Sequence, residues 1–147
     1  MTLVADVKER LLEQVDALAG AIEEAADLAE LIRQGALPQK SVAAFVLPLG
    51  VNGGAGEVAT GAFRQPFNEV VGVLLVIQTL GDAKAQRAIP TVDTLQLAIC
   101  QALCGWAPAS GAVGVMHMSR GRLVSVAGGT VFYQLDFSLQ NQLRTAT

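Results

Sequence analysis

The chain has 147 residues, of which 52% are hydrophobic and only 16% are charged. This length is typical of one domain, and the charged share is well below the roughly 25% of ordinary globular proteins. Part of the surface is therefore apolar, and we expect other subunits to cover it. The net charge is −3, without a basic run that alternates with aromatic residues, which argues against a nucleic-acid-binding surface.

The charges are unevenly distributed along the chain. Residues 1–30 contain eight acids and two bases, whereas the remainder contains five acids and eight bases. The acids and the helical period of the N-terminal segment do not fit a signal peptide, and the longest apolar run is shorter than the ~20 residues of a membrane span. We therefore expect no membrane association, and we expect the two cysteines to be reduced thiols in a cytosolic setting.

The first third of the chain predicts two helices. Residues 2–19 carry apolar side chains at three- and four-residue spacing, with Thr2 suited to cap the start and Gly20 to end the helix. A second, shorter helix is predicted over residues 23–34, where Gly35 takes the position after the C-terminus.

Two strands and a glycine-rich connection follow. Residues 41–47 predict a short strand that Pro48 ends. Residues 50–64 contain five glycines and no apolar period, so we expect a long, mobile loop. Residues 65–80 predict a strand buried on both faces near the middle of a sheet, because residues 70–77 within them form a nearly unbroken apolar run rich in β-branched side chains. Gly72 within it indicates a bulge, a bend or a close approach.

A third helix is expected after this strand. Residues 81–89 predict a polar connection, and Pro90 suits the first turn of a helix that runs to about Cys104. Gly105 ends the helix, and we expect Trp106 to fold back onto the core.

The C-terminal third predicts β-structure. After a turn at residues 107–111, one short strand is expected over 113–118, and residues 122–126 either continue it after a bulge or form a separate strand. A two-residue hairpin turn is predicted at 128–129. Residues 130–143 alternate apolar and polar side chains, as in a strand with one face toward a core.

Together these elements predict an α+β fold as a single domain over residues 1–147. We expect a mixed or antiparallel sheet of about four to five strands, with two to three helices packed mainly on one face.

No combination of residues indicates a catalytic or cofactor site. The glycines of residues 50–64 lack the Gly-Lys-Ser/Thr sequence and the following helix of a phosphate-binding loop. Cys100 and Cys104 share a helix face, but a metal site needs further ligands, and His117 is the only histidine. A Cys–His nucleophile pair would need His117 beside one of these thiols. Glu69 and Asp136 could act as an acid–base pair on a sugar only with sugar-binding aromatic residues around them, and the chain has few aromatic residues. We expect Cys100 and Cys104 to be core residues. We do not expect the protein to be an enzyme.

Several residues are instead candidates for a protein interface. The glycine-rich segment supplies most of them, and the arginines that flank Gly121 supply the rest, because arginine is enriched at interfaces. The candidates are Gly53, Gly54, Glu57, Phe63, Arg64, Arg120 and Arg122.

The order of these segments resembles the tail terminator (minor tail) proteins of long-tailed phages and prophages. The matching stretches run from about residue 4 to residue 144. They are AADLAELIRQGALP leading into AAFVLPLG, the glycine-rich GVNGGAGEVATGAFRQ, the strand NEVVGVLLVIQTLGDA, a helix ending in CGW, and the hairpin RGRLVSVAGGTVFYQLDFSLQNQLR.

The resemblance implies a structural protein without catalytic residues or cofactors. Such proteins assemble as a homohexameric ring that caps the finished tail tube and stops further polymerisation of the tail tube protein. The ring also presents a surface to the head–tail connector or neck protein. DNA passes through the ring without specific binding. The implied location is the head-proximal end of the virion tail, after assembly in the bacterial host cytoplasm. The alternatives are another neck or tail-completion subunit, or a small-molecule-binding α+β domain, which would need a pocket with convergent polar groups.

Overall fold

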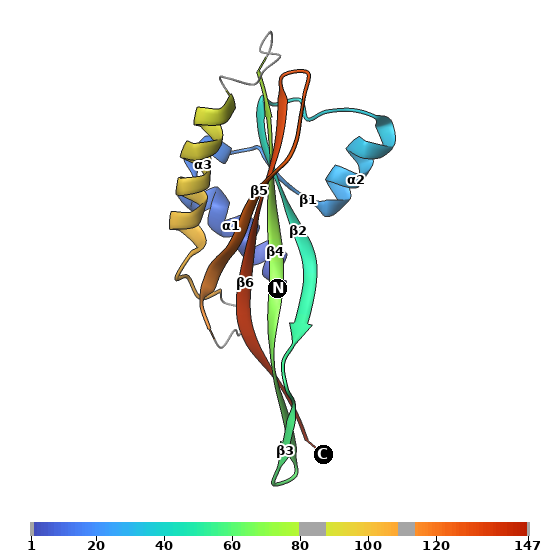
Figure 1. Cartoon of the computed structure of the whole chain (residues 1–147), viewed down its shortest axis with the longest axis vertical. Coiled ribbons are helices and arrows are strands. Elements are labelled where there is room, and N and C mark those ends of the chain that lie inside the picture. Colours follow the sequence, from blue (N-terminus) through green and yellow to red (C-terminus); the bar gives the residue numbers. More distant parts are fainter. Residues whose placement is uncertain (1, 80–87, 109–113, 147) are drawn as a thin grey trace.

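The computed structural model describes residues 2–79, 88–108 and 114–146. Three α-helices and six strands form an α+β domain, as predicted (Figure 1). The helices are α1 (Leu3–Gln14), α2 (Ala25–Gln34) and α3 (Ala88–Leu103). The strands are β1 (Ile22–Glu24), β2 (Val42–Gly53), β3 (Glu57–Ala59), β4 (Ala62–Gln78), β5 (Met116–Ala127) and β6 (Thr130–Ala146).

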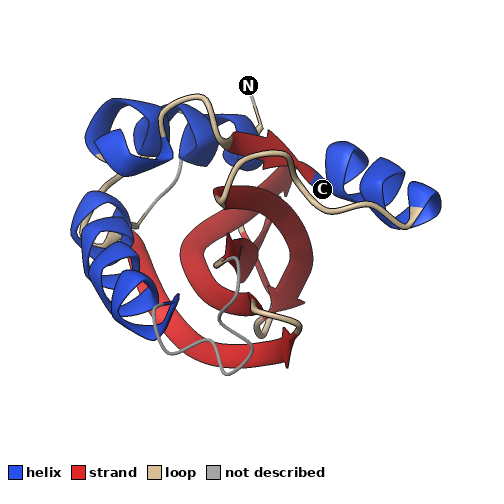
Figure 2. Ribbon diagram, turned by 90° about the horizontal axis from the view of Figure 1, so that it is seen from above, coloured by secondary structure: helices blue, strands red, loops and turns tan. Residues whose placement is uncertain are grey.

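The strands form one mixed sheet in the order β1-β2-β4-β6-β5, with β3 paired to β4. Only the β1–β2 pair is parallel, and the remaining pairs are antiparallel. The sheet is strongly curved when it is viewed along the strands (Figure 2). The strand number is slightly above the predicted four to five, because the short strands β1 and β3 were not expected.

The central strand was predicted correctly. β4 lies between β2 and β6, and Val71 to Ile77 are buried on both faces of the sheet. Gly72 marks a close approach: a Cβ atom there would lie 2.9 Å from Leu49 Cδ1 and 3.4 Å from Gln134 Nε2. Glycine thus lets two neighbouring side chains lie directly over the strand.

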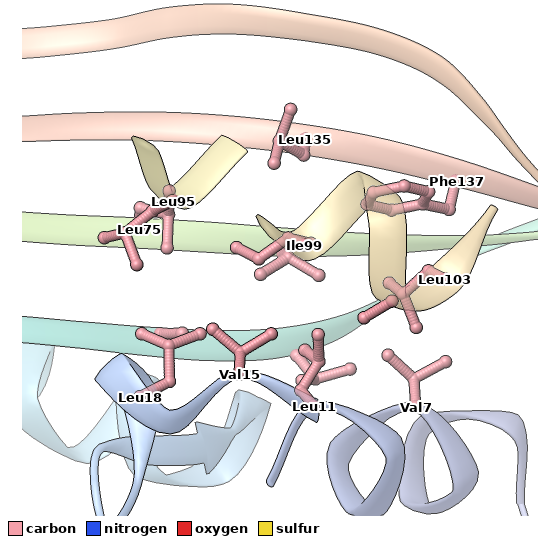
Figure 3. Close-up of a cluster of buried hydrophobic side chains, with 14 of the residues drawn as sticks. Val7, Leu11, Val15, Leu18, Leu75, Leu95, Ile99, Leu103, Leu135 and Phe137 are labelled. Carbon is pink, nitrogen blue, oxygen red and sulfur yellow. The ribbon is translucent and has the colours of Figure 1, made fainter. Parts of the chain in front are cut away.

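The main hydrophobic core lies between the sheet and the helices α1 and α3. Odd-numbered residues of β4 such as Val73 and Leu75 face this core. Figure 3 shows Leu75 in one cluster with Leu11 of α1 and with Ile99 and Leu103 of α3. We call this side of the sheet face A, and the opposite side face B. On face B a smaller cluster of Ala43, Phe45, Leu74 and Val76 packs against α2.

The N-terminal helices differ from expectation in their ends. Thr2 caps α1 as predicted, since its Oγ1 accepts from the Ala5 N–H at 3.2 Å, but the helix ends at Gln14. Val15 is extended, and a short 3-10 turn (Asp16–Leu18) follows. This break places both Val15 and Leu18 in the core.

The second helix begins later than predicted, because residues 22–24 form β1 beside β2 instead. Gly35 ends α2 in the left-handed conformation, as expected (φ 64°). None of the α2 side chains is fully buried, and only Leu28 and Leu31 contact the face B cluster.

The C-terminal hairpin was largely predicted. Gly128 and Gly129 both have positive φ, as a tight turn requires, and join β5 to β6. β5 is one strand rather than two, with register shifts between Met118 and Arg120 and between Leu123 and Ser125.

α3 ends at Leu103, one residue before the predicted end. After it, Gly105 has φ 79° and Trp106 packs against the core as expected. The predicted connection over 81–87, the end of the central strand at residue 80, and residues 109–113 of the expected turn and strand lie outside the described residues.

The largest correction concerns residues 50–64, which are not an irregular loop. β2 continues past Pro48 to Gly53, and β3 and the start of β4 form a hairpin around Thr60 and Gly61. Proline is tolerated within β2 because a register shift between Pro48 and Gly50 interrupts the ladder there.

We predict that Leu75→Ala, on face A, lowers the free energy of unfolding by about 2–5 kcal/mol, because it opens a cavity in the main core. Leu74→Ala, on face B, is the matched control and is expected to cost less, since its smaller cluster can collapse more readily. Chemical denaturation measures both; equal losses would show that the two clusters contribute alike.

Candidate functional site: an exposed β-arm and a sheet edge

The sheet extends into a narrow β-arm that no helix covers (Figure 1). We define the β-arm as residues 51–67 and 141–146, so that β4 lies in the middle with β2 and β3 on one side and β6 on the other. Residues 48–61 are all exposed. The arm therefore presents both of its faces to solvent in the single chain.

One face of the β-arm is apolar. Each residue of β4 has a partner in β6, so the alternation of faces continues from the core to the tip. Face A of the arm is mainly apolar: it carries Val51, Val58, Phe63, Phe67 and Leu143, with the polar residues Gln65, Asn141 and Thr145 between them, as the strand pairing shows. Val51 is 66% exposed, Val58 67% and Leu143 45%. This strip continues the apolar face of the core beyond the helices, which is a feature of interaction sites.

The other face of the β-arm is polar and carries two arginines opposite each other. Arg64 on β4 pairs in register with Arg144 on β6, and Glu57 on β3 lies on the other side of Arg64. Like charges directly opposite each other in a sheet are unfavourable. Arg144 Nε donates to Gln142 Oε1 at 2.7 Å.

Glycines allow the close packing within the arm. The Gly54 N–H donates to the Pro66 carbonyl at 2.7 Å, and Gln65 Nε2 donates back to the Gly54 carbonyl at 2.9 Å. A Cβ on Gly56 would lie 2.7 Å from Cζ of Phe63, so the ring lies over this glycine. The arm thus has defined pairing within the single chain.

The two remaining candidates lie apart from the arm, on the last strand of the sheet. Arg120 and Arg122 are exposed residues of β5 and face Asp136 and Gln134 of β6 on face B. Arg120 Nη2 lies 3.5 Å from Asp136 Oδ2, and Gln134 Nε2 donates to Asp136 Oδ1 at 2.8 Å. Asp136 and Gln134 are buried, so this arginine completes a polar network rather than standing free.

The structure thus divides the predicted interface residues into two groups. Gly53, Gly54, Glu57, Phe63 and Arg64 lie together on the β-arm, whereas Arg120 and Arg122 lie on β5. The apolar strip of Val51, Val58, Phe67 and Leu143 was not predicted from the sequence, and neither was Arg144. The signal available there was the even spacing of Phe63 and Phe67, each followed by a polar residue, Arg64 and Asn68.

The residues considered for catalysis do not come together. Glu69 pairs with Leu139 on face A and Asp136 lies on face B, so the sheet separates the two carboxylates. His117 is exposed on β5 and pairs with Ser138 of face B, whereas α3 with Cys100 covers face A. The described ranges 2–79, 88–108 and 114–146 contain no group of three His, Cys, Asp or Glu arranged to hold a metal ion. None of the helices in these ranges is long and apolar enough to cross a membrane.

The cysteines were only partly predicted. Cys100 is half-buried and packs against the main core, but Cys104 is exposed just beyond the end of α3. Burial, and then the neighbouring Cys104, raise the pKa of the Cys100 thiol.

Comparison with known proteins identifies the family. The family model for phage tail terminator protein matches residues 2–147. This chain belongs to the phage tail terminator family. The family is one of structural tail proteins, and the resemblance stated from the sequence is thereby confirmed. No curated protein sequence matches the chain.

A solved structure shares the fold. A chain of the structure "Virion of native gene transfer agent (GTA) particle" superposes with a TM-score of 0.58 at 17% sequence identity. The match covers 96% of this tail terminator family member and 95% of that chain. At this identity the likeness concerns the fold alone.

We predict that Gln134→Ala lowers the free energy of unfolding by about 1–3 kcal/mol, because it removes a hydrogen bond from a buried carboxylate. Arg122→Ala, the exposed cross-strand neighbour, is the control and is expected to stay within about 0.5 kcal/mol of the wild type. Thermal and urea unfolding measure both. A Gln134→Ala variant as stable as the control would show that Asp136 is satisfied without Gln134.

We predict that a thiol-alkylating reagent modifies Cys104 before Cys100 in the folded protein. The raised pKa of Cys100 leaves less thiolate near pH 8, and its side chain is also less accessible. Mass mapping of a time course gives both rates. Equal rates under native conditions, or faster modification of Cys100, would contradict the described burial.

Proposed function

We propose that this protein forms a ring of six copies that caps the head-proximal end of a phage tail tube. The ring stops further addition of the tube protein, provides the surface that joins the head–tail connector, and lets DNA pass without specific binding. Assembly takes place in the bacterial cytoplasm. Membership of the tail terminator family supports this proposal.

The observation that carries the proposal is the uncovered apolar face of the β-arm. In a single chain Val51 is 66% exposed, Val58 67% and Leu143 45%, although Val51 shares a shallow pocket with Leu3 and Val4 at the start of α1. Such a strip is unfavourable in an isolated subunit, and it becomes buried when another protein surface covers it. The low charged fraction of the whole chain supports the same conclusion.

The net charge of the chain is compatible with a DNA channel. A ring that held DNA tightly would need basic residues toward the phosphates. The chain instead has a net charge of −3 and no basic run. A negative net charge favours passage over binding.

We predict that the purified protein shortens tail tubes when it is added to polymerising tube protein, and that it binds tube ends. The double variant Val58→Ser/Leu143→Ser is expected to lose this activity while its free energy of unfolding changes little, because both side chains are exposed. The double variant Ile32→Ser/Leu37→Ser makes the same kind of change on and after α2, where Ile32 is 69% exposed, and is expected to cap normally.

Electron microscopy of tube lengths and native mass spectrometry of the free protein are the measurements. Unchanged tube length with the wild type, together with no binding to tube ends, would overturn the proposed function. Normal capping by the arm variant would show that the apolar strip is not needed for it. Binding to the portal side of the head without tube binding would indicate a neck subunit instead.

A further inference from the structure

A small pocket with three carboxylates lies beside α1. Its volume is about 240 Å³, and it is lined by Asp6, Glu9, Arg10, Glu13, Trp106 and Ala107. Asp6 is only 5% exposed, and its Oδ2 atom is buried without a hydrogen-bond partner among the described residues. A buried carboxylate oxygen without a donor is unfavourable, so the single chain leaves this site incomplete.

The one cation of the pocket is already engaged elsewhere. Arg10 Nε donates to the Ala102 carbonyl at 2.9 Å, and its guanidinium lies 5.4 Å from the centre of the Trp106 ring. The ion pairs of the described chain do not include one between Arg10 and Asp6. The pocket therefore keeps an excess of negative charge beside a buried, unpaired oxygen.

A metal ion does not fit this arrangement. Among the described residues, no three His, Cys, Asp or Glu side chains are arranged to hold a metal ion, and this includes the three carboxylates of the pocket. A guanidinium is the better match, because it is a flat cation with five N–H donors that can reach acceptors at different positions.

The same chain presents two arginines that form no ion pair with an acidic residue of the described chain. The guanidinium of Arg64 makes no hydrogen bond or ion pair with the described residues, and that of Arg144 makes one hydrogen bond with them, to the amide oxygen of Gln142. They face each other across β4 and β6, and the single carboxylate of Glu57 lies on the other side of Arg64. Two guanidinium groups beside one carboxylate leave this face of the arm with an excess of positive charge, which a further anion would offset.

We propose that the acidic pocket on α1 binds the Arg64–Arg144 pair on the β-arm of a second copy of this chain. The inference rests on the proposed ring and specifies which surfaces join its subunits. The buried Asp6 carboxylate lacks a hydrogen-bond donor, and the arginine pair lacks sufficient negative charge beside it. Each group therefore supplies what the other lacks.

The two surfaces are different patches of one chain, so the contact is head-to-tail. Every copy offers one arm and one pocket, and such heterologous contacts generate a ring when the rotation closes. The apolar face A of the arm lies opposite the arginine face and remains for a further contact, such as the tube end.

A charge exchange between the two surfaces tests the inference. One variant, Arg64→Glu/Arg144→Glu, has an acidic arm and an acidic pocket. The other, Glu9→Lys/Glu13→Lys, has a basic pocket and a basic arm. Each alone is expected to associate at least about tenfold more weakly than the wild type, because like charges now meet. An equimolar mixture restores both contacts, and native mass spectrometry should then show rings with equal numbers of the two variants.

Two further variants separate this contact from general effects. Arg33→Glu/Lys40→Glu changes the net charge as much as the arm variant does, but at exposed positions away from both surfaces, and should associate normally. Asp6→Asn should weaken association while it leaves the melting temperature of the monomer unchanged or higher, because it removes a buried, unpaired charge.

The outcomes distinguish the inference from the proposed function. No rescue in the mixture, or equal weakening by Arg33→Glu/Lys40→Glu, overturns the inference. A wild type that is monomeric even at millimolar concentration yet limits tube length also overturns it, while the proposed function stands. Rescue in the mixture without an effect on tubes supports the inference and overturns the function. Loss of duplex DNA binding in the arm variant with unchanged self-association would assign the arginines to DNA and overturn the inference.

Discussion

The pairing of β4 with β6 is the interaction on which the rest of the structure depends. Seventeen consecutive residues of β4, Ala62 to Gln78, each have a partner in β6, without a register shift. Because side chains alternate strictly along a strand, this ladder fixes which residues face α1 and α3 and which face α2. It also carries the same assignment beyond the helices into the β-arm. The core and the exposed arm are thus two parts of one continuous pair of strands.

The continuous ladder explains how a mostly exposed arm keeps a defined structure. At one end, Leu75 and Leu135 are completely buried between the helices and the sheet. At the other end, Val58 and Leu143 have similar apolar character but no cover. The core holds the strands in register, and the arm inherits that register through backbone hydrogen bonds. Burial at one end thereby supports a surface at the other that is available to another protein.

Much of the fold was predictable because its elements have local causes. The apolar run of residues 70–77, the Gly128–Gly129 turn and the cap at Gly35 each depend on a few neighbouring residues. β1 was missed because residues 22–24 form a strand only by lying beside β2, a contact from elsewhere in the chain. The β-arm was missed because the five glycines of residues 50–64 indicate a loop, and the spacing of Phe63 and Phe67 is too short a pattern to indicate a strand against them. The acidic pocket was missed because Asp6 lies on the helix among core positions, and sequence alone does not show that its oxygen lacks a partner.

The two register shifts in β5 have a consequence for how copies of this chain can meet. β5 is the last strand in the sheet order, and a regular strand in that position is a template to which a strand of another molecule can add without limit. The shifts near Ser119 and Val124 interrupt its ladder within twelve residues and bend the strand. Copies that approach this edge therefore meet through side chains rather than by extending the sheet. At this edge the shifts therefore oppose the strand-by-strand addition through which sheets grow into fibres.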